Sequence, residues 1–177
     1  RHRSVGGEPL CAGGRTSRVI KLYVRMARVG KINRDGMRRL TSLEICAGVG
    51  GQALGLERAG FDPVMLIDED PHSCSTLRKN RPGWDVAQMD LREFVASEHP
   101  KTLDVDLLSG GVPCTPYTVA GRRHGAADSR DLFTAAIWLV HEVRPRAVMI
   151  ENVPRLLQDE KFHGPREFAR AELRHLG

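Results

Sequence analysis

From residue 42 onward, short runs of consecutive apolar residues alternate with longer segments of helical spacing. Strands that are buried on both faces are apolar on consecutive residues, as in a parallel sheet covered by helices. The expected strands are 42–47, 63–68, 86–90, 105–110 and 147–152, and the expected helices are 52–59, 72–80, 91–97, 130–143 and about 165–176. This alternation predicts an α/β fold, with a doubly wound, mostly parallel sheet and right-handed crossovers.

Charge divides the chain near residue 40. Residues 1–40 hold 11 Lys and Arg against two acids, whereas residues 41–177 hold 16 against 20, within a total of 27 against 22. We therefore expect 1–40 to be a basic extension that is disordered or not native, and 41–177 to be the folded domain. If the beginning of this segment is not native, our hypothesis is that translation starts at Met26 or Met37, since both precede the first expected strand.

Several classes of protein do not fit the composition. No run of 18 apolar residues is present, so we expect no transmembrane helix and no association with a membrane. The four cysteines form no CxxC motif and no Cys/His cluster, which argues against a metal site and against a disulfide-rich secreted fold. We therefore expect a cytoplasmic protein that binds no metal.

A glycine-rich turn and two acids follow the first three expected strands. Gly48, Gly50 and Gly51 stand between a strand and a helix, where glycine allows a ligand to approach the backbone. Asp68 and Asp90 end the next two strands, and the three strand ends together indicate an adenosine site at the carboxyl edge of the sheet. The alternative is that both acids cap helices. The acidic run 68–70 leaves the ribose-binding acid open, with Asp68 favoured.

A thiol and a carboxylate follow the last two expected strands. Cys114 lies between two prolines after strand 105–110, and Glu151 ends an apolar run in strand 147–152. If both strands belong to the parallel sheet, the two groups emerge at the same edge as the glycine turn. The alternative is that Cys114 is a small core residue and Glu151 is solvated or caps a helix.

The long loop between the fourth strand and the helix at 130 is rich in Gly and Pro and carries Arg122, Arg123 and His124. Loops of this length are usually functional or disordered. We expect these three residues to contact nucleic-acid phosphates. The alternative is a solvated basic loop.

Six short motifs occur in the order and spacing of the cytosine-5 DNA methyltransferases, which residues 40–162 resemble. They are CAGVGG at 46–51, the acid at 68, MDL at 89–91, VPCTPYT at 112–118, DSR at 128–130 and IENV at 150–153. The resemblance implies S-adenosylmethionine as cofactor, Cys114 as the nucleophile that adds to carbon 6 of cytosine, and Glu151 as the acid at ring nitrogen 3. It places the following residues at the cofactor: Cys46, Gly48, Gly50, Gly51, Asp68, Glu69, Asp90, Leu91, Pro113 and Leu132.

The chain departs from the family at several positions. Cys46 replaces an aromatic residue, Thr115 replaces Gln and Asp68 replaces Glu. The target-recognition half of such an enzyme is not recognisable. We therefore expect 41–177 to be a partial, N-terminal methyltransferase domain acting on double-stranded DNA, in a restriction–modification system, together with a complementary chain for target recognition.

Three alternatives remain open at this point. The first is a non-catalytic cofactor-binding fragment or a subunit of a split methyltransferase. The second is a nicotinamide-dependent oxidoreductase, which the G-x-G-x-x-A stretch and Asp68 would support. The third is a relative that acts on RNA.

Overall fold

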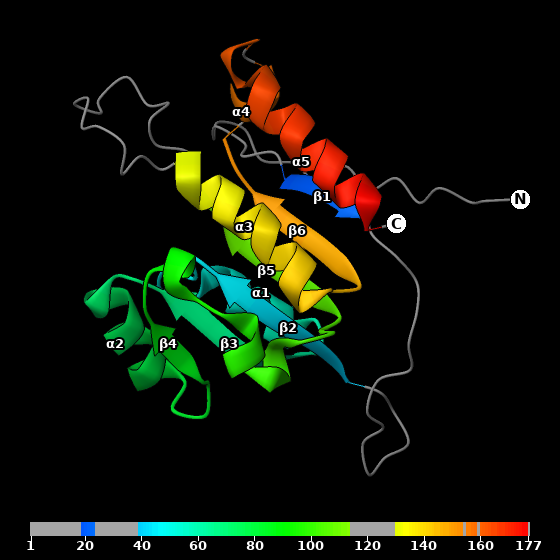
Figure 1. Ribbon diagram of the computed structural model, residues 1–177. Coiled ribbons are helices and arrows are strands. Elements are labelled where there is room, and N and C mark those ends of the chain that lie inside the picture. The colour runs from blue at the N-terminus through cyan, green and yellow to red at the C-terminus, as the bar shows by residue number, and fades with distance from the viewer. Residues whose placement is uncertain (1–18, 24–38, 114–129, 154, 159, 177) are drawn as a thin grey trace, which may run out of the picture.

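The computed structural model describes residues 19–23, 39–113, 130–153, 155–158 and 160–176, and within them six strands form one sheet (Figure 1). The sheet order is β1-β6-β5-β2-β3-β4. The strands are β1 (Val19–Tyr23), β2 (Leu40–Ile45), β3 (Phe61–Asp68), β4 (Val86–Gln88), β5 (Leu107–Gly111) and β6 (Ala147–Glu151). Strands β2 to β6 are parallel to one another, and β1 is antiparallel to its neighbour β6. The predicted α/β fold with a mostly parallel sheet is confirmed.

Helices cover both faces of the sheet. The helices are α1 (Gly51–Arg58), α2 (Pro71–Asn80), α3 (Arg130–Val143), α4 (Arg155–Gln158) and α5 (His163–His175). One core cluster joins Leu66 of β3 to residues of α1 and α2, and another joins its neighbours Met65 and Ile67 to residues of α3 and α5. Because successive residues of a strand point to opposite faces, the two clusters lie on opposite sides of the sheet.

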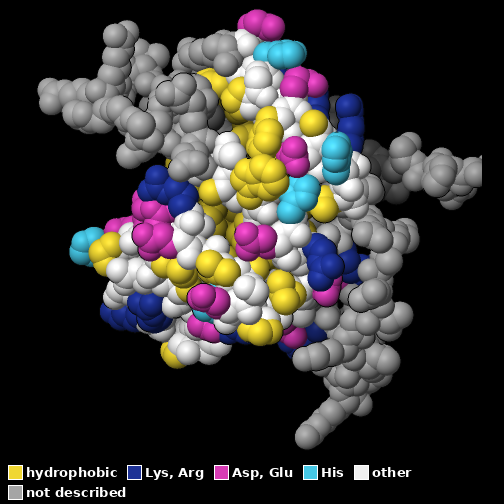
Figure 2. Space-filling model, in the orientation of Figure 1, with side chains coloured by type: hydrophobic (Ala, Val, Ile, Leu, Met, Phe, Trp, Pro, Cys, Tyr) yellow, Lys and Arg dark blue, Asp and Glu magenta, His cyan; other side chains and the backbone are white. Residues whose placement is uncertain are grey.

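Helices α3 and α5 lie beside each other over the same face (Figure 1). The ring of Trp138 in α3 packs edge-on against Phe168 of α5, with 6.0 Å between the ring centroids. Hydrophobic side chains gather along these two helices on the surface shown in Figure 2, and Trp138 is 50% exposed. None of the helices in the described ranges is long and apolar enough to cross a membrane.

The strand order places a topological switch point at β2. The chain passes from β2 to β3 on one side of β2, and β5 pairs with β2 on the other side. In open parallel sheets, ligands bind beside such a point, outside the carboxyl ends of the strands. The fold therefore points to the region around the ends of β2, β3 and β5.

The expected helix at 91–97 is wrong. Two short 3-10 turns, Leu91–Glu93 and Ala96–Glu98, take its place. Between them Phe94 is extended and only 5% exposed, in contact with the core. The side chains of Phe94 and Ala96 are both buried in the core. Phe94 reaches the core from an extended backbone, which interrupts the helix that the sequence pattern favoured.

Strand β1 lies within the segment expected to be a disordered or non-native extension. Residues 19–23 pair with β6 from Val19↔Glu151 to Tyr23↔Ala147. The remainder of that segment, up to residue 38, lies outside the described residues. The division of the chain at residue 40 stays a prediction.

Asp106 connects the amino ends of β2, β5 and β6. It is 8% exposed, and its Oδ2 accepts the Thr41 N–H at 2.9 Å while its Oδ1 accepts Arg146 Nη1 at 2.7 Å. Asp106→Ala removes these hydrogen bonds to a charged group. We expect the free energy of unfolding to fall by about 2 kcal/mol, measured by urea denaturation.

Asp62→Ala is the matched control. Asp62 forms one exposed ion pair with Arg39 at 2.7 Å. Such a pair contributes at most about 1 kcal/mol to stability. Equal losses in the two variants would contradict the role given to Asp106.

Candidate functional site

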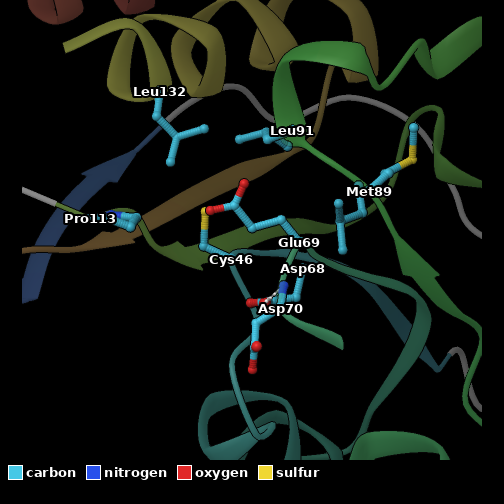
Figure 3. Close-up of a pocket in the computed structure, with 9 residues that line it drawn as sticks. Cys46, Asp68, Glu69, Asp70, Met89, Leu91, Pro113 and Leu132 are labelled. Atoms are coloured by element: carbon cyan, nitrogen blue, oxygen red, sulfur yellow. Dashed lines mark hydrogen bonds between the residues drawn. The ribbon is translucent and has the colours of Figure 1, made fainter. Parts of the chain in front are cut away.

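A cavity of about 140 Å³ opens at the predicted edge of the sheet (Figure 3). Its lining residues come from the ends of three strands, from the turn after β4 and from α3. They are Cys46, Ile67, Asp68, Glu69, Asp70, Met89, Leu91, Pro113 and Leu132. The cavity therefore lies at the switch point of the sheet.

The glycine turn after β2 depends on its glycines. Gly48 and Gly50 have φ of +54° and +86°, in the left-handed region that glycine adopts readily. A Cβ on Gly50 would lie 2.4 Å from Leu77 Cδ2 of α2. The turn thus lets α1 begin close to α2, next to Cys46 at the cavity.

Asp68 is held between two backbone donors. Its Oδ2 accepts the Gly48 N–H at 2.7 Å, and its Oδ1 accepts the Asp70 N–H at 2.9 Å. Each carboxylate oxygen has a further lone pair, so Asp68 can accept two hydroxyl donors from a ligand as well. This geometry suits the paired hydroxyls of a ribose.

The alternative that Asp68 and Asp90 cap helices is wrong for Asp68 and confirmed for Asp90. Asp70, not Asp68, caps α2 by accepting the Ser73 N–H at 2.8 Å and the Ser73 hydroxyl at 2.7 Å, and these hydrogen bonds lower its pKa. Asp90 caps the turn Leu91–Glu93 and forms an ion pair with Arg92, which lowers the pKa of Asp90. Asp90 is not among the residues that line the cavity. Its contact with a cofactor stays a prediction.

The thiol of Cys46 faces the cavity but is a poor nucleophile. Burial, followed by the charges of Asp68, Glu69 and Asp90, raises its pKa to about 12. The other cysteine in the described ranges, Cys74, is buried in the core, and burial raises its pKa. Since the thiolate is the reactive form, neither thiol suits nucleophilic catalysis.

This conclusion predicts slow alkylation of Cys46. At pH 8 we expect iodoacetamide to modify Cys46 at least about a hundredfold more slowly than free cysteine, whose thiol has a pKa near 8.5. Peptide mass spectrometry measures the rate, with free cysteine as the reference thiol. A comparable rate for the two thiols would show that Cys46 is not shielded by burial and acidic neighbours.

Glu151 lies at the carboxyl end of β6, next to the end of β5. It pairs with Gly111 in the sheet, and a Cβ on Gly111 would lie 3.6 Å from Glu151 Oε2. Two residues further along, Pro113 lines the cavity. The carboxylate and the segment that leads to Cys114 therefore leave the sheet at one edge, beside the cavity.

Apart from Asp90 and Glu151, described above, the predicted site residues fall into three groups. The cavity is lined by six of the ten residues expected at the cofactor: Cys46, Asp68, Glu69, Leu91, Pro113 and Leu132. Gly48, Gly50 and Gly51 form or follow the adjacent turn. Cys114, Arg122, Arg123 and His124 lie outside the described residues, so their roles stay predictions.

Two lining residues, Ile67 and Met89, were not predicted, and a third, Asp70, belongs to the acidic run in which Asp68 was favoured. Ile67 and Met89 directly precede the acids that drew attention to these strand ends, so their apolar side chains could have been included. In the described part of the chain, no group of His, Cys, Asp and Glu could hold a metal ion. The cavity combines fixed carboxylates with apolar walls, which suits a ligand with hydroxyls and a flat ring.

Comparisons with known proteins agree with the fold and show the family of the chain. The family model described as C-5 cytosine-specific DNA methylase matches residues 40–171. The Type II methyltransferase M.NgoMIV of Neisseria gonorrhoeae is 51% identical over 139 residues, which are 78% of this chain and 43% of that protein. The chain therefore spans less than half the length of this curated relative.

Two solved structures show the same architecture. A DNA modification methyltransferase encoded within a prophage (E. coli) is 28% identical, with a TM-score of 0.67, over 77% of this chain and 38% of that one. A TehB-like SAM-dependent methyltransferase from Corynebacterium glutamicum is 20% identical, with a TM-score of 0.54, over 77% and 66%. The second likeness concerns the fold alone.

Proposed function

Since the chain belongs to the C-5 cytosine-specific DNA methylase family, we propose that it carries the catalytic groups for transfer of a methyl group from S-adenosylmethionine to carbon 5 of cytosine in double-stranded DNA. The observation that supports this most is the shared edge of the sheet. Glu151, the segment that leads to Cys114 and the cavity all lie there.

The cavity residues fit the proposed cofactor. The Asp68 carboxylate, fixed by the Gly48 N–H, is positioned to accept hydrogen bonds from ribose hydroxyls. Met89 and Leu91 supply apolar surface for an adenine ring, and Pro113 and Leu132 lie at the other side of the same cavity (Figure 3). When bound, S-adenosylmethionine supplies an electrophilic methyl group.

The residues of the chain would then make the cytosine reactive. Carbon 5 is a weak nucleophile, so the Cys114 thiolate adds to carbon 6, and electron density moves to carbon 5. Glu151 holds ring nitrogen 3 and offsets the charge that develops on the ring. After carbon 5 has taken the methyl group, a base removes its proton and the Cys114 thiolate leaves carbon 6.

Access to the ring requires the cytosine to leave the stacked duplex and enter the site. Arg122, Arg123 and His124 are proposed to contact phosphates beside the extruded base. The 139 matched residues correspond to 43% of the length of the relative M.NgoMIV, and we propose that target recognition lies outside these 177 residues, on the same or on a complementary polypeptide. We place this reaction in the cytoplasm, within a restriction–modification system.

A methyl-transfer assay tests the proposal. The chain is incubated with duplex DNA and methyl-labelled S-adenosylmethionine, alone and with the C-terminal portion of M.NgoMIV. We expect label at carbon 5 of cytosine when the second polypeptide is present. Lack of label in both mixtures would contradict the proposal.

Binding separates this function from the nicotinamide alternative. We expect S-adenosylhomocysteine, but not NADH, to bind the chain in calorimetry. Binding of S-adenosylhomocysteine without methyl transfer in either mixture would favour the alternative of a non-catalytic fragment. Binding of NADH alone would favour the oxidoreductase.

A further inference from the structure

The side chain of Asn152 bridges the carboxyl ends of β5 and β6. Asn152 follows directly after β6 and is 4% exposed. Its Nδ2 donates a hydrogen bond to the Val112 carbonyl oxygen at 3.0 Å, across 40 positions of the chain. Its Oδ1 accepts the Val153 N–H at 2.8 Å.

This bridge continues the sheet beyond its last backbone pair. The ladder between β5 and β6 ends at Gly111↔Glu151, one residue before Val112 and Asn152. Val112 is 2% exposed, and its carbonyl oxygen accepts the side-chain amide. A buried backbone carbonyl without a partner is costly, and only Asn or Gln offers an amide donor and acceptor together in an uncharged side chain.

Both residues that the amide connects are neighbours of groups with a proposed role. Glu151 directly precedes Asn152, and Pro113, which lines the cavity, directly follows Val112. The Glu151 carboxylate lies over Gly111, with 3.6 Å between Oε2 and the position of a Cβ there. A change at Asn152 would therefore shift the end of β5 relative to Glu151.

We infer that Asn152 is a positioning residue for the proposed methyl transfer. Its amide fixes the Val112–Pro113 backbone, and through it the start of the segment that leads to Cys114, relative to the Glu151 carboxylate. The inference rests on the proposed function. A displacement of about 1 Å in a reacting group can slow a reaction by about a hundredfold.

Two substitutions separate the two hydrogen bonds. Asn152→Asp keeps an oxygen for the Val153 N–H but loses the donor to Val112, and Asn152→Ala loses both. We expect each variant to lower kcat for methyl transfer by about a hundredfold, while the affinity for S-adenosylhomocysteine changes less than about threefold. Asn80→Ala, which replaces an exposed amide at the end of α2, is the control and is expected to leave both quantities unchanged.

A double-mutant cycle with Glu151→Gln separates positioning from general stability. If Asn152 positions the start of the Cys114 segment against Glu151, the loss caused by Glu151→Gln will be at least about tenfold smaller in the Asn152→Ala background than in the wild type. Hydrogen exchange without cofactor provides a second readout. It should quicken at the carboxyl ends of β5 and β6 in Asn152→Ala and stay unchanged in β3 and β4.

The outcomes distinguish the inference from the function on which it rests. An inactive wild type in both mixtures would overturn the proposed function and, with it, the assignment of Asn152. An active wild type with multiplicative effects in the cycle would overturn the assignment alone. If both Asn152 variants are unfolded at the assay temperature, the residue is structural, and the assignment is likewise overturned.

Discussion

Cys114→Ala is expected to abolish methyl transfer, with a loss of at least about a thousandfold in rate. Without the thiolate, carbon 5 of cytosine stays too weak a nucleophile to take the methyl group. In the described part of the chain, burial raises the pKa of the Cys46 and Cys74 thiols, so we expect neither to form the bond to carbon 6 in its place. Glu151→Gln keeps the size of the side chain but cannot act as an acid at ring nitrogen 3. We expect a loss of about a hundredfold or more for this variant.

Cys11→Ala is the matched control, since it also removes one thiol. It should retain the wild-type rate of label transfer to DNA. Affinity for S-adenosylhomocysteine should be preserved in Cys114→Ala, because the nucleophile acts on the base and not on the cofactor. Retention of methyl transfer in Cys114→Ala would show that the nucleophile has been wrongly assigned.

Asp68→Ala is expected to weaken the binding of S-adenosylhomocysteine by about a hundredfold. The carboxylate is the proposed acceptor for two ribose hydroxyls, and each hydrogen bond to a charged group contributes about 1.5 kcal/mol. It also accepts the N–H groups of Gly48 and Asp70, so its loss frees the glycine turn from the end of β3. Isothermal titration calorimetry measures the affinity.

Asp85→Ala is the matched control, because it removes the same side chain from a position just before β4. Asp85 is exposed and forms an ion pair with Lys101 away from the cavity lining. Its replacement should leave the affinity unchanged. Equal affinities for Asp68→Ala and the wild type would mean that the ribose is not bound at the end of β3.

The sheet could be predicted because its strands are buried on both faces. Consecutive apolar residues in β3, such as Met65, Leu66 and Ile67, contact cores on opposite sides, and this pattern is visible in the sequence. Strand β1 was missed because Lys21 interrupts its apolar run and the run lies within the basic segment 1–40. The segment after β4 misled the prediction because Phe94 reaches the core from an extended backbone.

The site was predictable where strand ends determine it. Asp68 ends β3 and Pro113 lies two residues beyond the end of β5, and the parallel sheet brings them to one cavity. Asp90 occupies an equivalent position along the chain, but its neighbour Arg92 and the turn Leu91–Glu93 engage its carboxylate. The sequence offered both cofactor binding and capping for Asp90, and spacing alone does not decide between them.

The role inferred for Asn152 could not be predicted from the sequence. Its importance comes from a hydrogen bond to a backbone carbonyl 40 residues away. Backbone acceptors carry no signature in a sequence, so the residue could be recognised only once the ends of β5 and β6 were seen together. The same arrangement links Glu151 to Gly111 and so to the segment before Cys114.

The residue that attacks cytosine provides the most direct test. Duplex DNA in which the target cytosine is replaced by 5-fluorocytosine is incubated with S-adenosylmethionine, the chain and the C-terminal portion of M.NgoMIV, because fluorine at carbon 5 prevents release of the enzyme. Digestion and mass spectrometry then identify the modified peptide. We expect a methylated fluorocytosine bonded to the sulfur of Cys114, and attachment to Cys11, Cys46 or Cys74, or no attachment at all, would contradict the assignment of the nucleophile.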